Sequence, residues 1–347
     1  DGSPLKSEKD AVLAKYDSAG KLLWTKTLGA ADDATGYSLA VSDDGKVAVA
    51  GSTTGKISAD VKGGTDSFVT VFDAKGVEQW TRQSGTSQDD KAVGVAFDAD
   101  GNVVIAGMTK GPLAGVSQGS WDGYLQTFTA DGATVSKQQF GTSGEDSVAG
   151  VVVTDDGKVV VATTENGRGV LRKFDVAANA SGVPEWTQDL GDMGLGGQLT
   201  SIAYENGAIY LGGRTASASF DAAQGGTAFG GMQDGFIARF DDGVGGPTKA
   251  WGTYTGGSGD DVVRGIAVSN GKVYATGETT AAMGGATQVG TQDVFMAQFN
   301  GTTGAQEFVS QASGGAGYAK GASIAVDPNG DSVLDLLDAI GRIATSN

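Results

Sequence analysis

The sequence predicts an all-β protein, a six-bladed β-propeller with four-stranded antiparallel blades, on three observations. Two kinds of β-hairpin alternate along the chain, each kind occurs six times, and Asp-Gly or Asn-Gly turns join many of their strands. Two hairpins make a four-stranded unit of roughly 40 to 60 residues, which is typical of one propeller blade. The high glycine content, 59 of 347 residues, fits so many tight turns.

The first kind of hairpin begins with a strand in which apolar and polar residues alternate, and in most copies an aspartate precedes this strand. Its six copies begin at Asp10, Asp66, Asp122, Gly169, Asp234 and Asp293. The second strand of this hairpin carries a tryptophan in four copies, at Trp24, Trp80, Trp186 and Trp251. We predict that these tryptophans are structural and fill the gap between neighbouring blades at the outer strand.

The second kind of hairpin consists of an apolar strand, a turn and a β-branched strand. Two copies run over 37–51 and 93–107, and related copies begin at Val148, Leu199, Val263 and, in part, Tyr318. Their turns are Asp44-Gly45, Asp100-Gly101, Asp156-Gly157, Asn206-Gly207 and Asn270-Gly271. Asp-Gly and Asn-Gly tolerate positive φ at both turn positions, so they predict tight hairpins.

The repeats predict one propeller domain over residues 1–330. Complete blades are expected at 37–85, 92–141, 148–191, 199–256 and 263–310. Residues 10–28 supply only an outer hairpin and residues 318–330 only the start of an inner one, so the two ends are expected to close a sixth blade together. Such a closure leaves no exposed blade edge. Residues 331–347 have helical spacing of apolar side chains and are expected to form a short C-terminal helix or the start of a further domain.

A family resemblance follows from these repeats. Residues 10–29, Gly36 to Val41 and Asp44 to Gly51 resemble the bacterial SBBP β-propeller repeat, and the resemblance extends from about residue 10 to residue 330. It implies a propeller fold, and it implies no activity, because this repeat occurs in surface, secreted and appendage-associated bacterial proteins that share no reaction. The Gly- and Thr-rich composition and the sequence of residues 321–335 are also similar to the propeller part of flagellum-associated FlaEY-like proteins.

The composition excludes several functions. The chain has no His and no Cys, which rules out catalytic triads and zinc fingers that use these residues. Its formal net charge of −17 argues against binding to nucleic acid or to anionic membranes, because phosphate groups repel it. No apolar run approaches the ~18 residues of a membrane span. The absence of Cys fits a bacterial extracellular or periplasmic protein.

Acidic residues stand directly before four of the inner strands. They are Asp32, Asp33, Asp89, Asp90, Glu145, Asp146, Asp260 and Asp261. Because the same feature recurs in four blades, we interpret it as turn structure, in which Asp side chains accept backbone N–H groups. Two alternatives stay open: a cation-binding ring around one mouth of the channel, and a catalytic carboxylate pair, which would need one pair distinguished from the others.

The C-terminal part contains a partial calcium-loop pattern. Asp327, Asn329, Asp331 and Asp338 stand at positions 1, 3, 5 and 12 of such a loop. However, Ser332 replaces the usual Gly and Asp338 the usual Glu. Residues 323–330 also align with the inner strand and turn of the other repeats. We therefore favour a strand here and expect no cofactor.

The sequence thus predicts a non-enzymatic, extracellular or cell-surface bacterial propeller. It would act as a scaffold or binding module for a glycan or for a protein partner in a surface appendage such as the flagellum. The alternative is a carboxylate-dependent carbohydrate-active propeller enzyme. Such an enzyme should have one blade whose loops depart from the repeat and carry polar side chains that converge on one site. The longest insertion, 215–233, is mostly Ala, Gly, Ser and Thr. That composition favours the scaffold.

Overall fold

The computed structural model describes residues 10–29, 32–58, 62–176, 182–218, 229–312 and 317–326. These residues contain 22 strands. The chain divides into two compact units, of which one comprises residues 1–166 and 172–185 and the other residues 167–171 and 186–347. No helix in the described part of the chain is long and apolar enough to cross a membrane.

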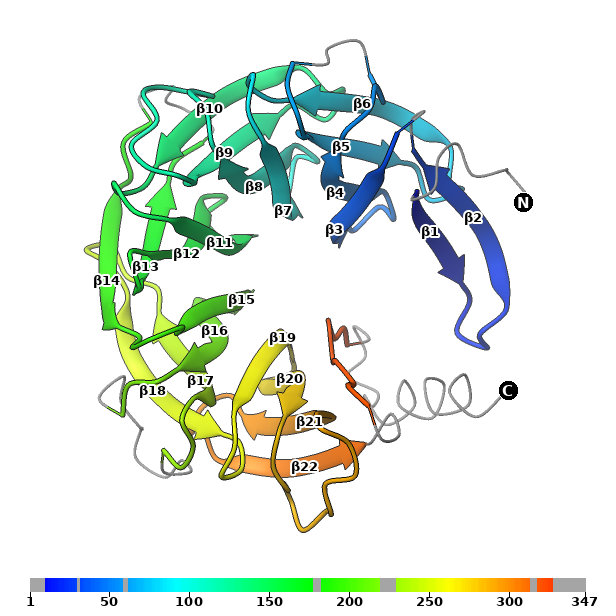
Figure 1. Ribbon diagram of the computed structural model, residues 1–347. Coiled ribbons are helices and arrows are strands. Elements are labelled where there is room, and N and C mark those ends of the chain that lie inside the picture. Colours follow the sequence, from blue (N-terminus) through cyan, green and yellow to red (C-terminus); the bar gives the residue numbers. More distant parts are fainter. Residues whose placement is uncertain are drawn as a thin grey trace. The chain divides into compact units, whose positions relative to one another are not determined.

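Five sheets have four strands each, hydrogen-bonded in chain order (Figure 1). The first sheet contains β3 (Ala34–Val41), β4 (Val47–Thr53), β5 (Asp66–Phe72) and β6 (Glu78–Ser84), and the second contains β7 (Asp90–Phe97), β8 (Val103–Thr109), β9 (Asp122–Phe128) and β10 (Thr134–Phe140). The third contains β11 (Asp146–Val153), β12 (Val159–Glu165), β13 (Arg168–Phe174) and β14 (Trp186–Asp192). The last two contain β15 (Gln198–Glu205), β16 (Ala208–Thr215), β17 (Asp234–Asp241) and β18 (Thr248–Thr255), and β19 (Asp261–Ser269), β20 (Lys272–Thr279), β21 (Asp293–Asn300) and β22 (Gln306–Ala312).

These sheets confirm the predicted all-β class with four-stranded antiparallel blades. Each sheet begins one to three residues before the predicted blade, because residues directly ahead of the predicted inner strand are themselves part of the ladder. Asp90 pairs with Thr109, and Asp261 pairs with Thr279. In all five sheets the register then shifts within the next four residues, so a β-bulge or similar irregularity recurs at the same place in each first strand.

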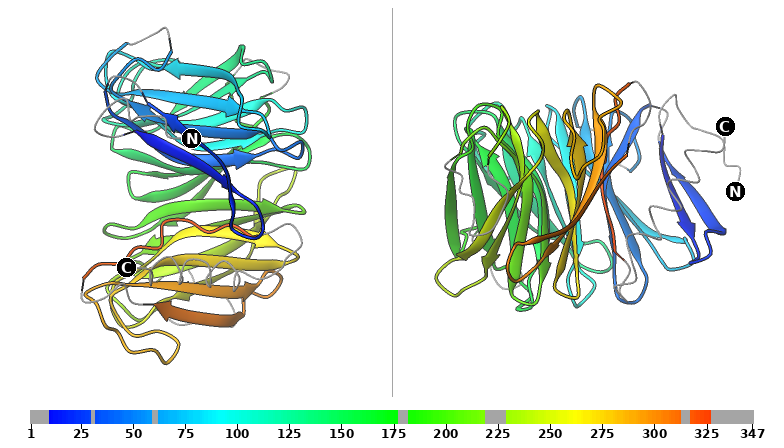
Figure 2. Two further views of the ribbon diagram at one scale, coloured as in Figure 1. Left: turned by 90° about the vertical axis from the view of Figure 1, so that its right-hand side faces the viewer. Right: turned by 90° about the horizontal axis from the view of Figure 1, so that it is seen from below.

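Two described segments near the ends of the chain lie outside the five four-stranded sheets. β1 (Ala11–Tyr16) and β2 (Leu22–Leu28) form a two-stranded sheet, drawn dark blue in Figures 1 and 2. Residues 317–326 lie against the last sheet, where Ile324 and Val326 pack on Tyr274 and Met296. Closure of a sixth blade by both ends stays a prediction. The predicted C-terminal helix lies outside the described residues.

The Asp-Gly and Asn-Gly turns form two conformational classes. Asn206-Gly207 and Asn270-Gly271 have positive φ at both residues and join their strands directly, as expected. At the Asp-Gly turns only the glycine has positive φ, and the loop is longer. There a side chain at the first loop position accepts the N–H at the fifth, as Ser42 does from Lys46. These Asp-Gly turns therefore differ from the predicted two-residue class because a side chain caps the longer loop.

Trp80 and Trp251 lie on fourth strands and pack toward the next sheet, as predicted. The ring centroid of Trp80 is 5.7 Å from that of Phe128, and its Nε1 donates to Ala130 O at 2.9 Å. Trp251 is buried and donates to Gly301 O at 2.9 Å. One aromatic residue thus closes the apolar junction and satisfies a carbonyl of the next hairpin.

Apolar side chains between successive sheets form the core of each unit. Val69 and Val71 of one sheet pack with Val95, Ile105 and Tyr124 of the next. Glycine is required where an aromatic ring of the third strand crosses the second strand. A Cβ on Gly107 would lie 2.0 Å from Lys91 O and 2.5 Å from the Tyr124 ring.

We expect Gly107→Ala to destabilise the chain. The added methyl group has no space, and overpacking of a core typically costs about 1–3 kcal/mol. Gly115→Ala is the matched control, because nothing lies within 4 Å of a Cβ at Gly115. The free energy of unfolding from denaturant titration is the measurement. Equal stabilities for the two variants would contradict the close packing of this strand.

Candidate functional site

The second residue of three acidic pairs is buried and holds the loop that precedes it. Asp90 accepts the N–H of Thr86 at 2.6 Å and its hydroxyl at 3.0 Å. Asp146 does the same with Thr142, and Asp261 accepts the N–H of Gly257 at 2.9 Å. All three are at most 2% exposed. These carboxylates are committed to loop structure and are closed to solvent.

A second set of buried aspartates begins the third strands. Asp122 accepts the N–H of Gln118 at 2.8 Å and that of Gly119 at 3.1 Å, and Asp234 and Asp293 hold their own loops in the same way. A glutamine of the fourth strand adds a further donor to this position. The three pairs are Gln83 with Asp66, Gln139 with Asp122, and Gln311 with Asp293, at 2.8 to 2.9 Å between nitrogen and oxygen.

The two sets of carboxylates meet at the junctions between sheets. A Cβ on Gly141 would lie 2.4 Å from Asp146 Oδ2 and 2.9 Å from Asp122 Oδ1, so both acids flank this glycine. Burial raises the pKa of Asp90 and of Asp146, and it raises the pKa of Asp261 to about 6. The neighbouring carboxylate adds to the rise at Asp90 and at Asp261.

The first residue of each acidic pair faces solvent more. Glu145 and Asp260 are exposed. Asp89 pairs with Lys110 at 2.8 Å, and this hydrogen bond lowers the pKa of Asp89. In the first sheet the acidic pair lies one residue earlier relative to the first strand. Ala34 takes the buried position there, because it pairs with Thr53 as Asp90 pairs with Thr109. Asp33 therefore corresponds to Asp89, and Asp32 is an additional exposed acid.

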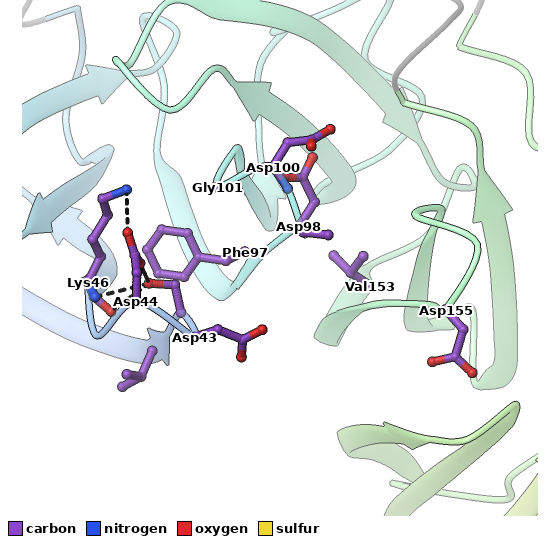
Figure 3. A pocket seen from close by; sticks show the side chains of 12 residues that line it. Asp43, Asp44, Lys46, Phe97, Asp98, Asp100, Gly101, Val153 and Asp155 are labelled. Carbon is purple, nitrogen blue, oxygen red and sulfur yellow. Dashed lines mark hydrogen bonds and ion pairs between the residues drawn. The ribbon is translucent and has the colours of Figure 1, made fainter.

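An acidic hollow of about 650 Å³ lies in the first unit, at the other end of the same strands. Three turns line it, those that follow β3, β7 and β11. Its carboxylates are Asp43, Asp44, Asp98, Asp100 and Asp155, and its ammonium group is that of Lys46. Val41, Phe97 and Val153 add apolar surface. Figure 3 shows Phe97 beside Asp44, and Asp43 and Asp155 on different sides of the hollow.

The acids of the hollow differ in how far they are engaged. Asp98 caps its own turn by accepting N–H groups of Asp100 and Asn102. Asp44 pairs with Lys46 at 2.8 Å, and hydrogen bonds from Lys46 and Ser42 lower its pKa to about 2. Asp43 and Asp100 are exposed. The hollow is therefore a fixed anionic surface at neutral pH.

The sequence identified some of these residues and missed others. The sequence identified Asp44 and Asp100 as turn residues. It did not show that their turns line one hollow, because that depends on how the sheets pack. The glutamines of the fourth strands were missed, although their repeated position in the sequence was a usable signal. Asp327, Asn329, Asp331 and Asp338, the calcium candidates, lie outside the described residues. In the described part of the chain, no three acidic side chains are grouped to hold a metal ion.

Comparison with known proteins agrees with the repeated sheets. Residues 79–114, which run from β6 to beyond β8, match the family model described as the SBBP beta-propeller repeat. The chain carries the SBBP β-propeller repeat. It is also 39% identical to regulatory protein FlaEY of Caulobacter vibrioides, in an alignment that covers 96% of this chain and 39% of FlaEY. The chain thus spans well under half the length of this relative.

Solved structures similar to this chain have low sequence identity to it. BamB from Moraxella catarrhalis is 14% identical, with a TM-score of 0.45 over 86% of this chain and 70% of BamB. Quinohemoprotein alcohol dehydrogenase from Comamonas testosteroni is 12% identical, with a TM-score of 0.48 over 89% of this chain and 58% of the enzyme. Likeness at this level says nothing about activity.

Asp261→Asn should flatten the pH dependence of stability. Because the pKa of Asp261 rises from 3.8 to about 6 on folding, the folded state binds a proton that the unfolded state releases. The stability from this proton is present below about pH 4 and is lost as the pH rises through 6. The variant keeps an oxygen that can accept the N–H of Gly257. It should remove a pH-dependent difference of at most about 3 kcal/mol.

Asp44→Asn is the control for this experiment. Asp44 is solvent-exposed and its pKa is about 2, so it stays ionised throughout pH 4 to 7. Denaturant unfolding at several pH values in that range measures both variants against the parent chain. A parent-like slope for Asp261→Asn would contradict the assignment of this titration to Asp261.

Proposed function

We propose that this chain is a non-enzymatic binding module of a regulatory protein similar to FlaEY, and that it holds a protein partner at the acidic hollow. The hollow is the observation that carries the proposal. Five carboxylates surround it with one lysine, and the apolar side chains of Val41, Phe97 and Val153 lie among them. Such a surface complements a protein segment that has Lys or Arg next to apolar residues.

The resemblance to FlaEY-like proteins supports a partner in the flagellum or another surface appendage. An extracellular or cell-surface location is a further part of the proposal, and it rests on the Cys-free composition. The non-enzymatic role is supported by the relative, which is named a regulatory protein. It is also supported by Asp90, Asp146 and Asp261, because these buried carboxylates accept loop N–H groups in the same way in three sheets.

Binding of a basic amphipathic peptide tests the hollow. The probe is a synthetic nonapeptide of alternating Lys and Phe, and fluorescence anisotropy measures its Kd. Asp43→Asn combined with Asp100→Asn removes two exposed charges of the hollow. We expect this double variant to bind about fivefold more weakly and the parent to lose affinity as salt is raised, since the contact is electrostatic.

Asp32→Asn combined with Glu145→Gln is the matched control. It removes two exposed charges that precede β3 and β11, whereas the hollow lies at the turns that follow these strands. We therefore expect a Kd within about twofold of the parent. Weaker binding by this control and unchanged binding by the first variant would move the partner to the other face. Turnover of a glycoside by the purified chain, abolished by one carboxylate substitution, would overturn the non-enzymatic role.

A further inference from the structure

Lys91, Lys110 and Trp121 gather at one end of the second sheet. The first residue of β7 pairs with the last residue of β8, which pairs in turn with the first residue of β9. Lys91 follows the first of these residues, Lys110 follows the second, and Trp121 precedes the third, so adjacent strands bring the three side chains together (Figure 1). This end of the sheet is opposite to the hollow, which lies at the turns that follow the first strands.

Both ammonium groups lie over the indole ring of Trp121. Lys110 Nζ is 4.7 Å from the ring centroid, and Lys91 Nζ is 5.0 Å from it. Such contacts arise because the electron-rich face of the ring attracts a cation. Lys110 also pairs with Asp89 at 2.8 Å, whereas Lys91 forms no ion pair with any described residue. Trp121 is half-buried, so the ring holds two cations close to the surface, and one of them lacks a counter-ion.

The ladder of the sheets does not require this cluster. The corresponding positions of the two lysines are neutral in the other four sheets, and threonine or glutamine precedes the other third strands that begin with aspartate. The residues are Thr35, Ser147, Gln198 and Val262 in place of Lys91, Thr54, Asn166, Ala216 and Thr280 in place of Lys110, and Thr65, Gln233 and Gln292 in place of Trp121. The second sheet therefore departs from the repeat at three positions that meet in space, which indicates a ligand site.

Carboxylates border the cluster and limit the kind of ligand that fits it. Asp89 bonds to Lys110, and Glu145 is exposed, with its main chain bridged to that of Trp121. A purely anionic ligand would be repelled by both acids. A sugar that carries one carboxylate can use every group. Its carboxylate pairs with ammonium groups, its hydroxyls donate to the acids, and its C–H groups contact the indole.

We propose that Lys91, Lys110 and Trp121 form a binding site for a uronic acid residue of a glycan. Lys91 is the main partner of the sugar carboxylate, because its ammonium group has no other ion pair among the described residues. Trp121 positions the sugar ring, and Asp89 and Glu145 accept its hydroxyl groups. The site is separate from the acidic hollow, so it adds a glycan ligand to the protein partner proposed there.

Three small probes separate the parts of this recognition. They are methyl β-D-glucuronide, methyl β-D-glucoside, which lacks the carboxylate, and acetate, which lacks the sugar. Titration calorimetry measures Kd, and the NMR signal of the Trp121 indole N–H, assigned by its absence in Trp121→Thr, shows where the probe binds. We expect the glucuronide to bind at least about tenfold more tightly than either of the others, because it alone engages the lysines and the ring together. Equal affinity for glucuronide and acetate, equal affinity for glucuronide and glucoside, or no binding of the glucuronide would overturn the proposal.

Substitutions test the role of each side chain. Lys91→Gln should weaken glucuronide binding about tenfold and leave glucoside binding unchanged, because only the charge is lost. Trp121→Thr introduces the residue that the first sheet has at this position, and it should weaken binding of both sugars about fivefold. The matched control is Lys75→Gln, in the exposed turn between β5 and β6, which should keep the glucuronide Kd within about twofold of the parent. Parent-like glucuronide binding by Lys91→Gln, with an unchanged Tm, would contradict the assignment of Lys91 to the carboxylate and with it the proposal.

An acidic peptide is the competing occupant of this site. A blocked dipeptide of two glutamates carries carboxylates without sugar hydroxyls, and tighter binding of this dipeptide than of the glucuronide would overturn the proposal. Asp43→Asn combined with Asp100→Asn should leave glucuronide binding unchanged, because these two acids belong to the hollow. Weaker glucuronide binding by that double variant would move the sugar to the hollow and would also overturn the proposal.

Discussion

The packing of one sheet's apolar face on the next is the interaction on which the rest of the structure depends. A four-stranded sheet with one bare face cannot bury enough apolar surface, so each sheet needs a neighbour. Val69 and Val71 meet Val95 and Tyr124 across one such junction. This packing sets where glycine must stand in the second strands and where tryptophan closes the junction in the fourth.

The acidic residues of this chain have two different physical roles. Buried aspartates such as Asp90 and Asp122 accept loop N–H groups, which offsets part of the cost of burying a charge. Burial still raises the pKa of Asp90, so at this position the offset is incomplete. Acids such as Asp43 and Asp100 are instead exposed to solvent. They give the turn face of the first unit its negative potential, which is the property that a cationic partner can use.

The sequence by itself determined the sheets, and the tertiary structure decided the sites. Alternation of apolar residues and Asp-Gly or Asn-Gly turns act locally, so the four-stranded repeat and the structural role of Trp80 could be predicted from neighbouring residues. The side-chain cap of Ser42 on its turn was missed, because the dipeptide alone does not distinguish a two-residue loop from a longer one. The hollow could not be predicted at all. It combines Asp43, Asp98 and Asp155, which are more than 50 residues apart in sequence, and only sheet packing brings their turns together.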